Sequence, residues 1–182
     1  MISIMSCLIQ PIFENGKTHH LKKDDVLFRA NDAVTSMHFV VDGTIDLIRH
    51  SQTGIKLILQ RAEPNQVLAE ASAHSDSYHC DAVATQPTVL KSITKRNFLS
   101  ILGKDPAVNL AWLKHLSSVV QTARYRAEIR TLRTVSDRLD AWSDFRSGLP
   151  PKGQLQNLAE ELGVSREALY RELARRRAAK TE

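Results

Sequence analysis

The first hundred residues alternate short apolar runs with turn-forming residues, which is the pattern of an antiparallel β-structure. The apolar runs are rich in β-branched and aliphatic residues, and pairs such as Asp42-Gly43 and Thr53-Gly54 separate them. The expected strands are 26–30, 36–50, 55–62, 81–86 and 88–93. Short strands at this spacing predict a β-sandwich or a β-barrel.

The hydrophobic pattern becomes helical after these strands. Residues 95–102 have the pattern of a short helix. Asp105 and Pro106 then supply an N-cap and a first-turn residue for a long helix over 107–133. A further helix is expected over 134–146. The second part of the chain is therefore predicted to be helical, with residues 149–153 as a linker.

The long helix carries an apolar seam in which the spacing alternates between three and four residues, as a two-stranded coiled coil requires. Its members are Leu113, Leu116, Val120, Ala123 and Ala127. Small side chains at the last two positions would allow two backbones to approach closely. The same spacing also describes one face of a core helix in a monomer, so periodicity alone leaves both interpretations open.

Two short amphipathic stretches joined at Gly163 follow near the carboxyl end. The positions expected to form their shared core are Leu158, Ala159, Leu162, Val164, Leu169 and Leu173. Gly163 permits a tight turn, and Ser165 is the expected N-cap of the second helix. This register predicts a helix-turn-helix, and the alternative is an ordinary helical hairpin with a solvated basic face.

The second of these helices presents side chains that suit recognition of base pairs. In its first turns lie Arg166, Glu167, Tyr170 and Arg171. Arginine can hold O6 and N7 of guanine, glutamate can accept from N4 of cytosine, and the first turns of a recognition helix face the major groove. The basic run that follows includes Arg175 and Arg176, which have the charge to neutralise phosphates.

Composition permits an anionic partner without requiring one. The 182 residues carry a net charge of +5, and the 42% hydrophobic content is enough for a packed core. Two cysteines, Cys7 and Cys80, cannot form a disulfide framework, and a cytoplasmic location is expected. No apolar run reaches the roughly 18 residues of a membrane span. No nucleophile–base set, P-loop or paired acidic site indicates an enzyme.

In this order, a β-roll, a long seam helix and a terminal helix-turn-helix resemble the cyclic-AMP receptor / fumarate-nitrate regulator (CRP/FNR) superfamily of bacterial transcription factors. The resemblance covers nearly the whole chain and is strongest in LAEELGVSREALYREL, with good matches in 22–70 and at VSDRL. It implies an α+β fold. The implied domains are an antiparallel β-roll of the cyclic-nucleotide-binding type over 1–106, a dimerisation helix over 107–133 and a DNA-binding domain over 134–182.

The resemblance also implies a function. Arg166, Glu167 and Arg171 fall on the family's base-reading positions, so a homodimer is expected to bind a palindromic DNA site whose half-site has a G·C-anchored TGA core. RNA polymerase is a further partner that the resemblance implies. Family members usually continue into a β-hairpin wing, and a short form without the wing is expected because the sequence ends at Glu182.

Three departures from the family occur at turns. Asp24, Asn31 and Asn65 stand where the family usually has glycine. After glycine, asparagine and aspartate tolerate the left-handed backbone conformation best. These three turns are therefore expected to keep the left-handed conformation that glycine adopts in the family.

The resemblance places the effector-binding cassette at residues 65–82. Glu70 keeps the family's acid for the ribose hydroxyl, but His79, Cys80 and Asp81 replace the arginine, hydroxyl residue and alanine that follow. Ala69 replaces the glycine before Glu70. Loss of the guanidinium forfeits a charged hydrogen bond worth roughly 1.5–3 kcal/mol. A cyclic nucleotide is therefore disfavoured, and a different signal is expected.

Other chemistry in the cassette remains open, and no cofactor is certain. His74, His79 and Cys80, with Cys7, could bind zinc, copper or haem iron, and the two thiols could form a redox couple. His79 and Cys80 are adjacent, however, so in a strand they point to opposite faces. The remaining interpretation is a pocket without a small ligand, in which Cys80 is a small buried apolar residue.

Overall fold

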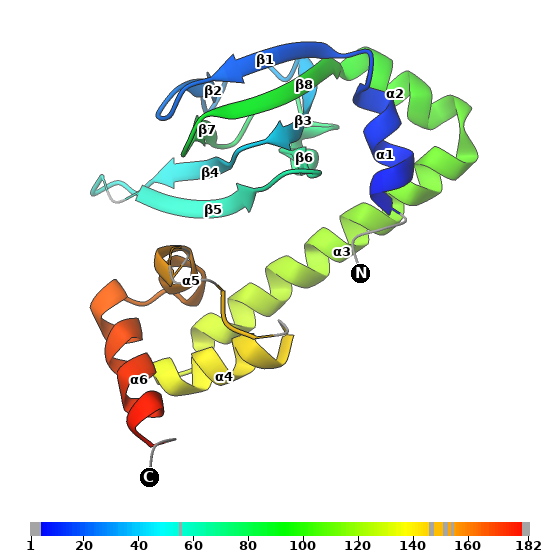
Figure 1. Ribbon diagram of the computed structural model, residues 1–182. Coiled ribbons are helices and arrows are strands. Elements are labelled where there is room, and N and C mark those ends of the chain that lie inside the picture. Colours follow the sequence, from blue (N-terminus) through cyan, green and yellow to red (C-terminus); the bar gives the residue numbers. More distant parts are fainter. Residues whose placement is uncertain (1–4, 55, 146–147, 151–152, 154, 180–182) are drawn as a thin grey trace. The chain divides into compact units, whose positions relative to one another are not determined.

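The computed structural model describes residues 5–54, 56–145, 148–150, 153 and 155–179 (Figure 1). The chain divides into two compact units, Met1–Leu116 and Ser117–Glu182. The division falls inside the long helix α3 (Pro106–Thr131), whereas the sequence predicted a boundary at its start.

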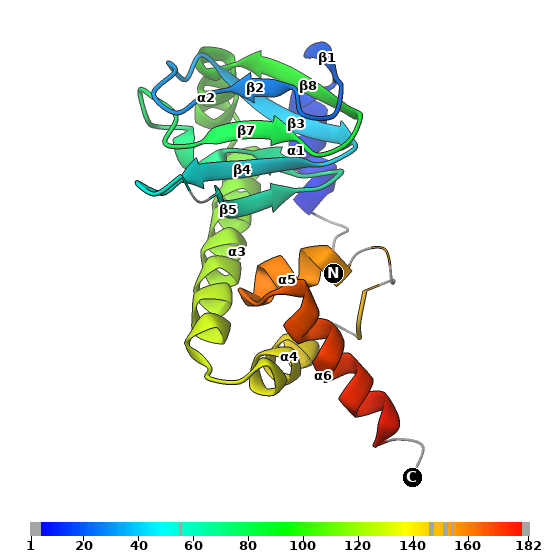
Figure 2. The same cartoon turned by 90° about the vertical axis from the view of Figure 1, so that its left-hand side faces the viewer.

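The amino-terminal unit contains two four-stranded antiparallel sheets, which confirms the predicted β-roll (Figure 2). The first sheet has the order β1 (Lys17–Leu21), β8 (Thr88–Thr94), β3 (Ser36–Asp42) and β6 (Val67–Leu68). The second has the order β2 (Val26–Phe28), β7 (Asp81–Ala84), β4 (Ile45–His50) and β5 (Lys56–Ala62). Strands β1 and β6 were not expected from the sequence.

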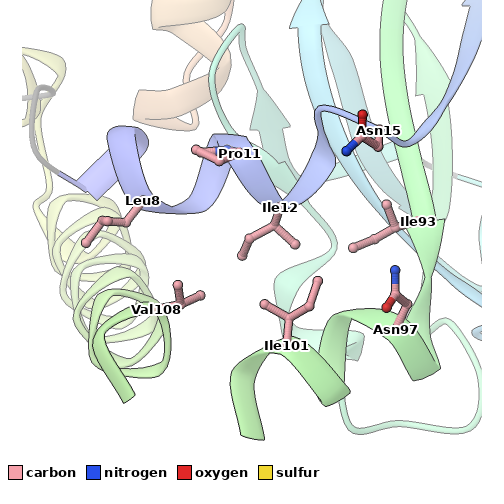
Figure 3. A pocket seen from close by; sticks show the side chains of 8 residues that line it. All are labelled: Leu8, Pro11, Ile12, Asn15, Ile93, Asn97, Ile101 and Val108. Carbon is pink, nitrogen blue, oxygen red and sulfur yellow. The ribbon is translucent and has the colours of Figure 1, made fainter. Parts of the chain in front are cut away.

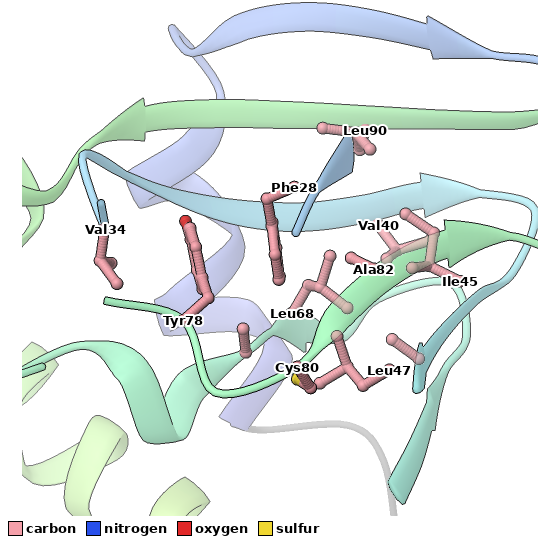
Figure 4. Close-up of a cluster of buried hydrophobic side chains, with 12 residues drawn as sticks. Phe28, Val34, Val40, Ile45, Leu47, Leu68, Tyr78, Cys80, Ala82 and Leu90 are labelled. Atoms are coloured by element: carbon pink, nitrogen blue, oxygen red, sulfur yellow. The ribbon is translucent and has the colours of Figure 1, made fainter. Parts of the chain in front are cut away.

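A hydrophobic core fills the space between the two sheets (Figure 4). Strand alternation sends every second side chain into this core, as Ile45 and Leu47 of β4 illustrate. Phe28 and Tyr78 stack within it, with ring centroids 3.6 Å apart. The Tyr78 hydroxyl donates a hydrogen bond to the Ser36 carbonyl at 2.9 Å, so the polar end of this buried ring has a partner.

Helices cover the outer face of the first sheet and form a second core. They are α1 (Met5–Phe13), which the sequence did not predict, α2 (Lys95–Lys104) and the first turns of α3. Phe13 of α1 stacks on Phe39 of β3, and Phe98 of α2 meets Trp112 of α3 edge-to-face with centroids 4.9 Å apart. Asp105 caps α3 as predicted, because its Oδ1 accepts from the backbone N–H groups of Ala107 and Val108.

Left-handed turns shape the β-roll. Asp24, Asn31 and Asn65 have φ values of 70°, 72° and 68°, so the predicted tolerance for this conformation is used at all three turns. Ala69 also has a positive φ, of 57°. Alanine lacks the polar side chain through which asparagine and aspartate stabilise this conformation. Gly43 allows the tightest approach, since a Cβ there would collide with Thr88.

The carboxyl-terminal unit consists of α4 (Val135–Phe145), α5 (Leu155–Leu162) and α6 (Arg166–Ala178), together with the end of α3. Its core contains the predicted residues Leu158, Ala159, Leu162, Leu169 and Leu173, joined by Ile129, Leu139, Trp142 and Leu155. Two helices joined by a tight turn, α5 and α6, are therefore present where the sequence predicted a helix-turn-helix. Within the described residues of either unit, no helix is both long and apolar enough to cross a membrane.

Candidate functional site

Helix α6 separates an apolar face from a charged one. Leu169 and Leu173 are buried, whereas Arg166, Glu167 and Arg171 are exposed. The Arg166 guanidinium lies 5.3 Å from the ring centroid of Tyr170, one turn further along the helix. These four residues are the ones that the sequence predicted for base recognition. The three charged ones face solvent, whereas Tyr170 is partly buried against the core of the unit.

The start of α6 is fixed by local hydrogen bonds. The Ser165 hydroxyl accepts from the backbone N–H of Ala168 at 3.1 Å, so Ser165 is the N-cap that was predicted. Gly163 has φ 64°, and the Val164 N–H donates to the Ala159 carbonyl at 3.0 Å. Together these contacts set the angle at which α6 leaves the turn.

Arg138 of α4 holds this turn and was not singled out from the sequence. Its guanidinium donates to four backbone carbonyls, those of Arg130, Leu132, Leu162 and Gly163, at distances of 2.8–3.1 Å. The last carbonyls of a helix lack partners within the helix, and Arg138 supplies donors near the ends of α3 and α5 together. The resemblance at VSDRL was the available signal, because Arg138 is its fourth residue.

The two arginines predicted to contact phosphates take part in a network within the unit. Arg176 donates to Glu172 and to Asp140 of α4, both at 2.6 Å, and to the Ser136 carbonyl at 3.0 Å. Arg175 donates to the same Glu172 at 2.8 Å and leaves most of its side chain exposed. Hydrogen bonds from Arg175 and Arg176 lower the pKa of Glu172 to about 2. Arg176 therefore braces α6 against α4, and only Arg175 presents an open face to an anion.

The seam of α3 lies largely in solvent in a single chain. Leu113 and Val120 are 54% and 49% exposed, and Ala123 and Ala127 are exposed as well. Leu116 differs, because it packs against the core cluster of the amino-terminal unit. Most of the seam is thus not a core face of this chain.

The effector cassette retains its acid in a buried position. Glu70 begins a short 3-10 helix, η1 (Glu70–Ser72), directly after the left-handed Ala69, and it is only 3% exposed. Its carboxylate accepts from the Gln60 side-chain amide at 3.1 Å. Burial raises the pKa of Glu70, and the amide of Gln60 only partly opposes this effect.

The next part of the cassette does not present an anion-binding pair. His79 is exposed, whereas Cys80 is 1% exposed and packs with Leu47 and Leu68 in the core between the sheets (Figure 4). The two side chains therefore point to opposite sides, as predicted. Burial raises the pKa of the Cys80 thiol, so the reactive thiolate is disfavoured. The Asp81 carboxylate accepts from the Ala30 N–H at 2.7 Å.

The predicted metal ligands are not brought together. His74 and His79 are exposed while Cys80 is buried, and the side chain of Cys7 lies outside the described residues. Among the residues that the structure describes, no group of three or more histidine, cysteine, aspartate or glutamate side chains could hold a metal ion. His79 and Cys80 lie in the bend that precedes β7, and one side chain is exposed while the other enters the core.

A cation that the sequence did not reveal lies beside the cassette. Arg49 of β4 donates through Nε and Nη2 to the His79 carbonyl, at 3.3 and 3.0 Å. It reaches this carbonyl from β4, the strand that pairs with β7. The charge of Arg49 lowers the pKa of the Cys80 thiol, but burial raises this pKa by more. A charged residue within the apolar run of β4 was the only available signal.

Comparison with known proteins agrees with this architecture. The family model of the cyclic nucleotide-binding domain matches residues 18–105. A search of curated protein sequences found no significant match. The c-di-GMP responsive global regulator CLP of Xanthomonas campestris is 18% identical, with a TM-score of 0.70 over 96% of this chain and 93% of that one.

Two further solved structures share the fold across both units. FixK2 from Bradyrhizobium japonicum is 15% identical, with a TM-score of 0.71 over 91% of this chain and 86% of that one. A CRP-family transcriptional regulator from Thermus thermophilus is 12% identical, with a TM-score of 0.64 over 89% and 85% of the two chains. At these identities the likeness establishes the fold, and the site residues must carry any functional conclusion.

Proposed function

Because residues 18–105 belong to the cyclic nucleotide-binding domain family and the whole chain has the fold of the CRP/FNR-type regulators, we propose that this protein is a transcription regulator that binds DNA through α6 as a homodimer. The observation that carries the proposal is that α6 has one buried apolar face and one exposed charged face. Its apolar residues are buried in the unit, and the base-reading set Arg166, Glu167 and Arg171 faces solvent.

The exposed α3 seam supports the homodimer. Leu113 and Val120 are apolar side chains about half exposed, and the small Ala123 and Ala127 extend the same stripe. Pairing two such stripes would bury them as a coiled-coil seam. A dimer would then present two copies of α6 to half-sites about one helical turn of DNA apart, roughly 34–36 Å.

The cassette favours a signal other than a cyclic nucleotide. A cyclic phosphate needs charged donors, but the position of the family's arginine holds an exposed histidine, and the next residue is a buried thiol. CLP is described as responsive to c-di-GMP, so a regulator with this fold can respond to a nucleotide other than cyclic AMP. We expect millimolar cyclic AMP to leave DNA affinity unchanged, as measured by fluorescence anisotropy, and a clear increase in affinity would contradict this.

The decisive test of the recognition helix is a single substitution on its open face. After a preferred duplex has been selected from a random pool, Arg171→Ala should weaken binding by about 1–3 kcal/mol and relax the preference at one base pair. The loss arises because two hydrogen bonds to guanine disappear. Affinities for the selected and single-mismatch duplexes, measured at one salt concentration, give both numbers.

Arg96→Ala is the matched control for this test. It removes the same charge from an exposed position on α2, in the other unit, and should change affinity and preference little. Arg176 is unsuitable as a control because its replacement would disturb the contact between α4 and α6. Equal losses for Arg171→Ala on selected and random duplexes would show that Arg171 does not read a base.

A further inference from the structure

A cleft on the amino-terminal unit lies apart from the cassette. It has a volume of about 360 Å³ and is formed by α1, β8, α2 and the first turn of α3 (Figure 3). Its lining residues are Leu8, Pro11, Ile12, Asn15, Ile93, Asn97, Ile101 and Val108. This volume falls within the roughly 300–1,000 Å³ that is typical of small-molecule sites.

The lining has two chemically different ends. Figure 3 shows the carboxamides of Asn15 and Asn97 on the same side of the cleft, near Ile93, and the aliphatic side chains of Leu8 and Val108 at the other end. None of the eight lining side chains carries a charge. A carboxamide both donates and accepts hydrogen bonds, so the polar end can serve a neutral group of either kind.

We propose that this cleft binds a small uncharged amphiphile, with its aliphatic chain between Ile12, Ile101 and Val108 and its amide or hydroxyl head between the two carboxamides. A charged head group is disfavoured because the cleft offers no counter-charge, and an unpaired charge is costly to remove from water. A purely apolar ligand would leave the two carboxamides without new partners.

The position of Val108 connects this site to regulation. Val108 lies in the first turn of α3, and its N–H is one of the two groups that Asp105 caps. Helix α3 continues into the second unit and carries the seam proposed for dimerisation. A ligand that contacts Val108 therefore touches the helix that both units share. This regulatory part rests on the proposed DNA-binding function, whereas the binding part does not.

Isothermal titration calorimetry of the full chain with octanamide tests the binding part directly. The wild-type protein should give saturable binding, and octanoate should bind more weakly because of its charge. Asn97→Leu should weaken octanamide about tenfold, since one hydrogen bond to the head is lost. Gln10→Leu is the matched control, because Gln10 is an exposed carboxamide on α1 that does not line the cleft.

A second variant fills the cleft. Ile101→Phe should abolish octanamide binding, and equal binding by a variant with an unchanged unfolding temperature would overturn the proposal. No binding by the wild type up to the solubility of octanamide would overturn it as well. If Ile101→Phe does not fold, Asn97→Leu decides, because an unchanged affinity would refute the assigned head-group site.

DNA affinity with and without saturating octanamide tests the regulatory part. We expect a change of at least about fivefold, the lower end of typical allosteric coupling. Bound ligand without any change in DNA affinity would overturn the regulatory role. If the protein fails to bind DNA at all, the proposed function fails, while calorimetry still decides whether the cleft binds its ligand.

Discussion

Each of the two units buries a glutamate, and the two carboxylates lie in opposite electrostatic surroundings. Glu172 in the carboxyl-terminal unit accepts from Arg175 and Arg176, which lower its pKa to about 2. Glu70 in the β-roll accepts from the neutral amide of Gln60, and burial raises its pKa. The charged form of the glutamate is thus stabilised by its surroundings in the carboxyl-terminal unit and destabilised by burial in the β-roll.

This difference separates a structural role from a candidate functional one. Glu172 joins the guanidinium groups that brace α6 on α4, so its charge stabilises the proposed recognition helix. Among the residues that the structure describes, Glu70 has a hydrogen bond from the neutral Gln60 and none from a cation, so its burial opposes the charged form. A buried acid with a raised pKa is typical of a functional site, and a ligand that donates to Glu70 would relieve the cost.

Replacing Glu172 should produce the largest effect on stability. Glu172→Ala removes charged hydrogen bonds from two arginines, and we expect it to lower the free energy of unfolding by about 1.5–3 kcal/mol. Urea denaturation followed by circular dichroism measures the change. Glu167→Ala is the control, because Glu167 is exposed on the same helix and its loss should matter little. Equal effects of the two substitutions would show that the network does not brace α6.

The two glutamates should also give stability opposite pH dependences. The folded pKa of Glu172 lies below the ordinary value of 4.5, so its contribution to stability is present above pH 4.5 and is lost as the pH falls toward about 2. The folded pKa of Glu70 lies above 4.5, so Glu70 lowers stability progressively as the pH rises above that value.

Glu70→Gln tests the second half of this comparison. It removes the cost of burying a charge while keeping the shape, and we expect a gain of about 1 kcal/mol at neutral pH. The gain should vanish below pH 4.5, where the carboxyl group is protonated in the folded and unfolded states alike. Chemical denaturation at two pH values measures it, and a loss of stability at neutral pH would refute the interpretation that burial destabilises the charged form of Glu70.

A smaller gain is expected at the residue before Glu70. Ala69 has φ 57°, and the left-handed conformation costs a non-glycine residue roughly 1–2 kcal/mol. Ala69→Gly relieves this strain but adds backbone entropy to the unfolded chain, so the net gain should be about 0.5–1 kcal/mol. Ala73→Gly is the control, because Ala73 has an ordinary φ of −55° and should lose stability. The same sign for both substitutions would argue against strain at Ala69.

The sequence predicted those parts of the fold that depend on local patterns. The N-caps Asp105 and Ser165, the left-handed turns and the buried face of α6 all follow from short spacings, and the structure confirms them. Strand β1 (Lys17–Leu21) was missed because KTHHL is too polar to look like a strand. Strand β6 was missed because it has only two residues, and its pairing with β3 defines it.

Long-range pairing accounts for what was missed at the candidate site. The sequence predicted opposite orientations for His79 and Cys80 on the assumption of a strand, and one is exposed and the other buried although both lie in the bend before β7. The hydrogen bond from Arg176 to Asp140 could not be predicted from the sequence. The two residues are 36 positions apart, and only the packing of α6 on α4 brings them together. Arg49 contacts the cassette for the same reason, because it lies on β4, which pairs with β7 in the same sheet.

The most direct test of the account is the specificity of DNA binding by the wild-type chain. Affinities for the best duplex selected from a random pool and for a scrambled duplex of the same length should be compared at one salt concentration. We expect a palindromic, G·C-anchored site that is bound at least about a thousandfold more tightly than the scrambled duplex. Equal affinities for the two duplexes, falling together as salt is raised, would show only electrostatic attraction to phosphates and would contradict it.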